Sequence, residues 1–202
     1  MIHDESYRMS TENDPFLIGT GIHDITGPAA EVGMMGYSMP HQKTEGIHMR
    51  LRSRAFVIAS PEKEKQVAIV SADLGMIFHA VKQKVIEKLK KKFPGLYDYG
   101  NVLLSANHTH SGPGGYSHYS LYNLAILCFD EKNFNCIVDG IYKSIVKAHN
   151  NLNPGKIFIN SGELNNVSMN RSPIAYEKNP QEERNQYGSD INKEMTLLCS
   201  FR

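Results

Sequence analysis

The segment Asn101-Val102-Leu103-Leu104-Ser105-Ala106 decides the fold class, because it is a short apolar stretch between two amphipathic segments. Apolar side chains recur every four residues from Ile77 to Leu89, which predicts a helix that Phe93-Pro94-Gly95 ends. A second one-sided apolar stripe, from Ile137 to Leu152, predicts another helix, ended by Asn153-Pro154-Gly155. The sequence therefore predicts a strand with a helix on either side of it.

Further apolar segments extend this pattern in both directions along the chain. The predicted strands cover residues 16–22, 55–59, 67–70, 156–160 and 195–201. A long polar loop is expected over 165–192, and the glycine-bracketed methionines of 33–37 predict tightly packed irregular backbone. Strands that alternate with helices predict an α/β domain with layered sheets flanked by helices.

The two ends of the chain bear on its domain organisation. Residues 1–15 are polar and are predicted to form a mobile N-terminal segment. Residues 16–202 form one portion of a domain, and their last strand is as apolar as a central core strand. A complete domain seldom stops within a central strand, so we expect an incomplete domain. The alternative is an edge strand that closes the domain.

Composition and charge exclude several classes of protein. The 202 residues carry 22 Lys and Arg against 21 Asp and Glu, which gives no electrostatic basis for nucleic-acid binding. A hydrophobic content of 41% excludes intrinsic disorder. The longest apolar run, 124–129, is far shorter than a membrane span, and the N-terminus shows no secretory signal. Cys128, Cys136 and Cys199 allow one disulfide at most, and the sequence leaves that pairing open.

The most informative chemical motif follows the strand 101–106 directly and reads Asn107-His108-Thr109-His110-Ser111-Gly112-Pro113-Gly114-Gly115-Tyr116. Residues two apart in extended backbone project to the same side, so His108 and His110 can enter one cavity and begin a zinc site. A catalytic zinc needs at least one further protein ligand and an open position for water. The alternative is a pair of surface or hydrogen-bonded core histidines. A phosphate-binding loop is disfavoured, because the lysine and spacing of that motif are missing.

Other polar residues have two readings on sequence alone. Arg171 in Asn170-Arg171-Ser172-Pro173 can clamp a polar substrate group, or it can tie the loop backbone together. Asp24 and Asp73 follow predicted strands, and each carboxylate can accept a hydrogen bond from a metal-ligating side chain. Turn and capping roles are the simpler interpretation.

Two further groups of ring side chains are interpreted more simply. We expect three histidines to be ordinary structural or surface residues: His79, His118 and His149. Tyr116, Tyr119 and Tyr122 can line an apolar entrance or belong to the core.

Six segments, in order along the chain, resemble the neutral ceramidase family. They are 19–28, 31–37, 50–56, 108–116, 148–155 and 170–176. The resemblance covers nearly the whole chain but only the N-terminal part of the family's catalytic domain. It implies a zinc-dependent amidase that splits ceramide into sphingosine and a fatty acid.

The resemblance also implies roles for individual residues. His108 corresponds to the first zinc ligand, and His110 to a neighbouring catalytic histidine. Arg171 resembles the arginine that lines the same pocket, where it is expected to serve catalysis and substrate binding, and Tyr116 is expected to contact the substrate. His48 matches a place where the family offers a backbone carbonyl to a structural divalent cation, Ca²⁺ or Mg²⁺.

The resemblance further implies what this chain lacks. In the family a second histidine, a glutamate and a tyrosine complete the zinc site, and these lie beyond the position of Arg202, as do the active-site serine and an immunoglobulin-like domain. We therefore expect a fragment that is inactive alone and whose partner is the missing C-terminal part. The sphingolipid substrate is expected at a membrane or micelle surface. The resemblance also implies a secreted or membrane-associated protein. The alternative is a non-catalytic lipid-binding or regulatory derivative of the scaffold.

Overall fold

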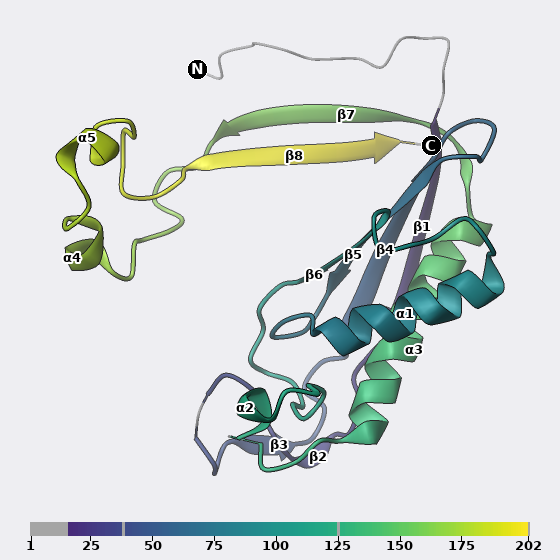
Figure 1. The fold of residues 1–202 in the computed structure, drawn as a ribbon, viewed down its shortest axis with the longest axis horizontal. Coiled ribbons are helices and arrows are strands. Elements are labelled where there is room, and N and C mark those ends of the chain that lie inside the picture. Colours follow the sequence, from purple (N-terminus) through teal and green to yellow (C-terminus); the bar gives the residue numbers. More distant parts are fainter. Residues whose placement is uncertain (1–15, 38, 125, 202) are drawn as a thin grey trace. The chain divides into compact units, whose positions relative to one another are not determined.

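The computed structural model describes residues 16–37, 39–124 and 126–201 (Figure 1). Within these ranges the chain forms two compact units. The first, described over residues 16–156, is called the sheet–helix unit, and the second, Ile157–Phe201, is called the β7–β8 unit. The expected mobile segment, 1–15, lies outside the described residues.

The sheet–helix unit is built on a mixed sheet whose strands follow the order β6-β5-β4-β1. These strands are β1 (Phe16–Asp24), β4 (Arg52–Ala59), β5 (Gln66–Ala72) and β6 (Val102–Ala106). Neighbours pair antiparallel except β5 and β6, which are parallel and are connected through helix α1 (His79–Lys92). The first residues of β7 (Asn153–Glu163) pair antiparallel with β1. The parallel pair places the carboxyl ends of β5 and β6 side by side.

One face of the sheet forms the core with α1 and α3 (Glu131–Asn150), which run beside the strands in Figure 1. Residues of β4 alternate between buried and more exposed positions, as expected for a strand covered on one side. Ala55 and Val57 of that strand are buried in the same cluster as Val81 of α1 and Ile141 of α3. The predicted α/β class, with a sheet flanked by helices, is confirmed.

Helix α3 approaches β1 closely because β1 presents glycines to it. A Cβ atom on Gly19 or Gly21 would overlap backbone carbonyl oxygens of α3, those of Ala148 and Ser144 respectively. Only glycine therefore allows this spacing between strand and helix. Helix α3 also begins six residues before the predicted start at Ile137, because its first turn is polar and is capped by Asp130, whose side chain accepts a hydrogen bond from the Asn133 amide.

Three short elements that the sequence did not reveal complete the sheet–helix unit. Strands β2 (Ala30–Gly33) and β3 (Lys43–Glu45) form a small antiparallel sheet, and α2 (Ser120–Asn123) is a single helical turn. Met34 forms an isolated antiparallel bridge with Pro113. The irregular segment 33–37 is therefore packed, as predicted, and it contacts the loop that carries the histidines.

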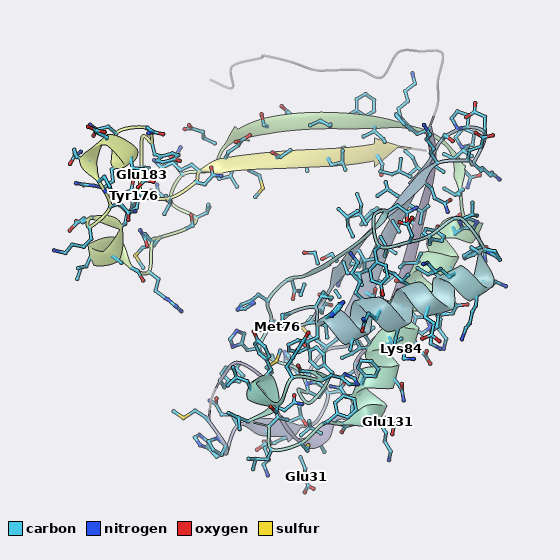
Figure 2. The ribbon with its side chains drawn as sticks, viewed as in Figure 1. Glu31, Met76, Lys84, Glu131, Tyr176 and Glu183 are labelled. Atoms are coloured by element: carbon cyan, nitrogen blue, oxygen red, sulfur yellow. The ribbon has the colours of Figure 1, made fainter. Side chains whose placement is uncertain are left out.

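The β7–β8 unit contains the rest of β7, which pairs with β8 (Glu194–Phe201), and two short helices. These helices, α4 (Pro173–Tyr176) and α5 (Gln181–Arg184), lie in the segment predicted to be a polar loop. Tyr176 and Glu183, labelled in Figure 2, mark this part of the unit. None of the described residues from 157 to 200 is buried.

The last strand predicted from the sequence, 195–201, is present as β8. In the part of the chain that the structure describes it has one neighbouring strand, β7, and Leu197 and Leu198 remain about half exposed.

Cys128, Cys136 and Cys199 are free thiols, and burial raises the pKa of the Cys136 thiol. Among the described helices none combines the length and apolar character needed to cross a membrane.

Candidate functional site

His108 and His110 lie together just beyond the carboxyl end of β6, in a loop that we call the histidine loop, Asn107–Tyr116. Their ring centroids are 5.0 Å apart, with 68° between the ring planes. The extended backbone assumed from the sequence is wrong, because His108 has a φ of 63°, in the left-handed region. The turn at His108 brings the two rings together instead. His108 is exposed and His110 is partly buried.

The spacing of the two imidazoles fits part of a zinc site. Two imidazoles on one tetrahedral zinc, at about 2.0 Å per bond, place their ring centroids about 5 Å apart. The observed separation fits two ligands of one zinc, and it also fits one ligand with a second imidazole beside it. Among the described residues, no group of three or more His, Cys, Asp or Glu side chains is arranged to hold a metal ion. The pair therefore fits an incomplete ligand set.

The segment 33–37 holds His110 from one side. A Cβ atom on Gly36 would overlap the His110 ring, so glycine is needed there for the imidazole to keep its place. The Tyr37 ring packs edge-on against His110 at 5.6 Å, and the Tyr37 hydroxyl lies 3.2 Å from Ser111 Oγ. The packing predicted for this segment thus orients a histidine of the candidate site.

Asp73 anchors the first residue of the histidine loop. It follows β5, and its carboxylate accepts hydrogen bonds at 2.8 Å from Arg54 Nη1 and Asn107 Nδ2. Asn107 Oδ1 in turn accepts from the Thr109 amide at 3.1 Å. Asp73 therefore acts on the histidine loop through Asn107. The parallel pairing of β5 and β6 explains this contact, because it brings the residues that follow the two strands together.

The first turn of α3 anchors the other end of the histidine loop. Asn133 Nδ2 donates to the carbonyl oxygens of Pro113 and Gly114, at 2.9 and 2.7 Å. The Asp130 amide donates to the carbonyl oxygen of Gly115 at 2.7 Å. The sequence analysis did not single out Asn133. A signal was present, because Asn133 stands four residues before Ile137 on the mainly apolar side of α3.

Asp24 stabilises the turn after β1, one of the two roles considered for it from the sequence. Its Oδ1 accepts a hydrogen bond from the Thr26 amide at 2.8 Å, and its Oδ2 lies within 3.6 Å of the guanidinium groups of Arg50 and Arg52. Burial alone raises the pKa of the Asp24 carboxyl, but the hydrogen bonds from Thr26 and the two arginines lower it below its ordinary value.

A groove of about 650 Å³ lies beside the histidine loop. Thr109, Ser111 and Gly112 form its border with that loop. The apolar part of its lining consists of Pro28, Ala29, Met34, Ile47, Met49, Leu51 and Pro113. His48 also lines the groove and is exposed. The groove therefore borders the histidine loop with a largely apolar surface, which Lys43 and Glu45 also line.

Tyr116 lies in the core, with an exposed fraction of 2%. Its hydroxyl donates to the carbonyl oxygen of Met76, just before α1 and labelled in Figure 2, at 3.2 Å. Burial raises the pKa of Tyr116 to about 12. These contacts give Tyr116 a packing role, and substrate contact by Tyr116 stays a prediction. Tyr119 and Tyr122 are exposed.

Arg171 belongs to the β7–β8 unit, where its side chain is exposed. Its expected place beside the histidines stays a prediction.

The three histidines expected to be ordinary structural or surface residues have such places. His79 is the exposed first residue of α1, and His118 is exposed with its ring 4.6 Å from that of Phe129. His149 is bonded through Nδ1 to the Tyr97 hydroxyl at 2.9 Å.

With this geometry in place, comparison with known proteins identifies the family. Residues 16–202 match the family model described as neutral/alkaline non-lysosomal ceramidase, N-terminal. The chain belongs to this family. The recognition made from sequence segments is therefore confirmed.

Individual neutral ceramidases agree with the family match. The neutral ceramidase of Pseudomonas aeruginosa is 54% identical over 184 residues, which cover 91% of this chain and 27% of that protein. Neutral ceramidase 3 of Arabidopsis thaliana is 52% identical, over 91% of this chain and 25% of the relative. A crystal structure of the Pseudomonas aeruginosa neutral ceramidase matches with a TM-score of 0.86 and 53% identity, over 93% of this chain and 29% of that one. The chain thus spans about a quarter of these curated relatives.

Proposed function

We propose that this chain supplies part of a zinc-dependent amidase site that hydrolyses ceramide to sphingosine and a fatty acid. The observation that carries the proposal is the imidazole pair at 5.0 Å, held on an anchored loop in a chain of the neutral ceramidase family. The relatives are named neutral ceramidases, which supports ceramide as the substrate class.

The two histidines have different roles in this proposal. His108 would hold the zinc, because it is the more exposed imidazole, whereas His110 is packed against Gly36 and Tyr37. When bound, zinc polarises an amide carbonyl and lowers the pKa of a coordinated water to about 7. His110 would accept a proton from the attacking water and pass it to the departing amine nitrogen. The packing of Gly36 and Tyr37 around His110 suits a residue whose ring must keep one orientation.

Three further residues complete the proposal. The groove beside the histidine loop would take part of one alkyl chain of a sphingolipid presented by a membrane or micelle. Arg171 would bind a polar group of the substrate and serve catalysis, and Tyr116 would contact the substrate. The carbonyl of His48 would be offered to a structural Ca²⁺ or Mg²⁺, since these cations prefer oxygen ligands.

The ligand count determines what the chain can do alone. The described residues bring two imidazoles together, whereas a catalytic zinc has three protein ligands and a water. We therefore expect the purified chain to bind zinc weakly and to release no sphingosine from ceramide. Ligands from further polypeptide are required for turnover, and amide cleavage by the purified chain with zinc would contradict this expectation.

A chimera tests the function directly. Residues 16–202 would replace the matched part of the Pseudomonas aeruginosa neutral ceramidase, and sphingosine release from ceramide in detergent micelles would be measured by mass spectrometry. We expect an active chimera. His110→Ala should lower kcat by about 10²–10⁴, the usual contribution of a general acid–base residue, and His108→Ala should reduce both activity and bound zinc.

The matched control is His118→Ala, which removes an exposed imidazole outside the histidine loop. Its activity and zinc content should equal those of the unsubstituted chimera. A folded chimera that retains full activity after His108→Ala would exclude the proposed role of His108, and a folded chimera with no activity toward ceramide would refute the proposed function.

A further inference from the structure

The contact between α3 and the histidine loop uses every donor that the Asn133 carboxamide has. Its Nδ2 group carries two N–H bonds, and these go to the successive carbonyl oxygens of Pro113 and Gly114 at 2.9 and 2.7 Å. Asn133 has an exposed fraction of 0%, so water cannot replace these bonds if they are lost. With the Asp130 amide on Gly115, three consecutive carbonyl oxygens of the loop are bound by one helical turn.

We propose that Asn133 is a positioning residue that fixes the orientation of His108 and His110 through the histidine loop. A role of Asn133 in catalysis rests on the proposed function, but the orientation of the two imidazole rings by Asn133 does not require bound zinc. The loop is held by Asp73 and Asn107 before the histidines and by Asn133 after them. Within the loop, the Thr109 and Ser111 amides bond to side chains of the loop itself. The two anchors, together with the packing of Gly36 and Tyr37 on His110, therefore set the direction of the two rings.

The side chain of Asn133 is separable from the capping of α3. The cap uses the Asp130 carboxylate and the backbone amide of Asn133, and the carboxamide takes no part in it. A change of the carboxamide can thus release the loop and leave the cap in place. Aspartate fits the same space but places a carboxylate against two carbonyl oxygens, and alanine leaves both carbonyls without a donor.

The surroundings leave Asn133 little freedom to adjust. A Cβ atom on Gly27 would overlap Asn133 Oδ1, so the carboxamide lies directly against the backbone of the turn after β1. Gly114 is packed equally closely on its other side, where its amide donates to the carbonyl oxygen of Gly33 at 2.9 Å. The loop is thus held between α3 and the segment that packs on His110.

Substitution with imidazole spectroscopy tests the proposal. Asn133→Ala and Asn133→Asp would be compared with Ser144→Ala, which removes another fully buried hydrogen-bonding side chain of α3 about 16 Å further along the helix. ¹⁵N NMR of the metal-free full chain reports each histidine ring separately. We expect the His108 and His110 resonances to shift and broaden in both Asn133 variants, while those of His149 stay in place. In Ser144→Ala the His108 and His110 resonances should remain native.

A zinc titration of the same proteins adds a second readout. Zinc affinity should fall by roughly tenfold in the Asn133 variants, the lower end for loss of an orienting contact behind a ligand, and should be unchanged in Ser144→Ala. If the rings move in the Asn133 variants but the chimera with the Pseudomonas aeruginosa enzyme binds no zinc, the positioning role stands and the proposed function fails. Rings that respond equally to the Asn133 and Ser144 changes would overturn the positioning role.

Hydrogen exchange on the unsubstituted chain keeps the proposal testable if the variants do not fold. The Gly114 amide, bonded to Gly33, and the Phe134 amide, bonded to Asp130, should become exchangeable in the same opening event because the Asn133 carboxamide links their segments. Exchange of Gly114 through an opening that leaves Phe134 protected would overturn the proposal.

Discussion

The sheet–helix unit and the β7–β8 unit show how differently the same chain buries its apolar side chains. In the first, Val57, Ile141 and Ile145 have exposed fractions of 0% and lie between the sheet and its helices. In the second, Ile159 and Leu197 are 51% and 56% exposed. The first unit therefore gains most from the removal of apolar surface from water, which is the dominant favourable term in folding.

The difference assigns the stability of the described structure to the sheet–helix unit, which also carries the histidine loop. Changes to buried side chains of α3 should therefore lower the free energy of unfolding far more than changes of the same kind in β7 or β8. Paired substitutions of one residue type, one in each unit, test this expectation.

The largest effect should come from Ile141→Ala in α3. This change creates a cavity in the core and should lower the free energy of unfolding by about 2–5 kcal/mol. The matched change Leu197→Ala in β8 should cost less than about 1 kcal/mol, because that side chain is already half exposed. Chemical denaturation followed by circular dichroism measures both, and losses of equal size would show that the two units are not stabilised differently.

An intermediate effect should come from Gly21→Ala in β1. The new methyl group would overlap the Ser144 carbonyl oxygen, and the resulting shift of strand and helix should cost about 1–3 kcal/mol. Gly162→Ala in β7 is the control, since a Cβ atom there meets no heavy atom within 4 Å. Its effect should stay within about 0.5 kcal/mol. A harmless Gly21→Ala would mean that α3 does not pack on β1 as closely as described.

The smallest effect is a pH dependence that belongs to the sheet–helix unit alone. Burial, helped by the positive charge of Lys63, lowers the pKa of His149 below its ordinary value of 6.5. The unfolded chain therefore binds this proton more readily than the folded chain. The contribution of His149 to the free energy of unfolding should be complete above pH 6.5 and should decrease as the pH falls below 6.5.

His149→Gln should remove this part of the pH dependence, and denaturation midpoints at several pH values measure it. His118→Gln, which removes an exposed imidazole of the same unit, is the matched control. Residues 157–201 contain no histidine, so titration of histidines should not affect local opening of the β7–β8 unit. A profile that survives His149→Gln would assign the pH dependence to another group.

The parts of the fold that the sequence predicted are those with a long regular pattern. The four-residue repeat of apolar side chains in α1 and the apolar run of β6 are strong signals, and each element lies within two residues of its predicted place. The start of α3 was missed because capping by Asp130 replaces an apolar signal with a polar one. Strands β2 and β3 have four and three residues, which is too short for a periodic signal.

The sequence predicted the histidines of the candidate site but not the hydrogen bonds that hold their loop in place. The spacing of His108 and His110 and the glycines after them pointed to one cavity, although the left-handed turn at His108 was not foreseen. The contacts of Asn107 and Asn133 depend on segments that only the fold brings together. An asparagine in a sequence does not reveal which backbone carbonyl it will bind.

The double anchorage of the histidine loop has a consequence for engineering. Hydrogen bonds fix Asn107 to Asp73 and Pro113 to helix α3, so the distance that the five residues between them must span is fixed. New side chains at positions 108 and 110, such as cysteine for a softer metal or aspartate for a harder one, can be introduced there without redesign of the sheet or its helices.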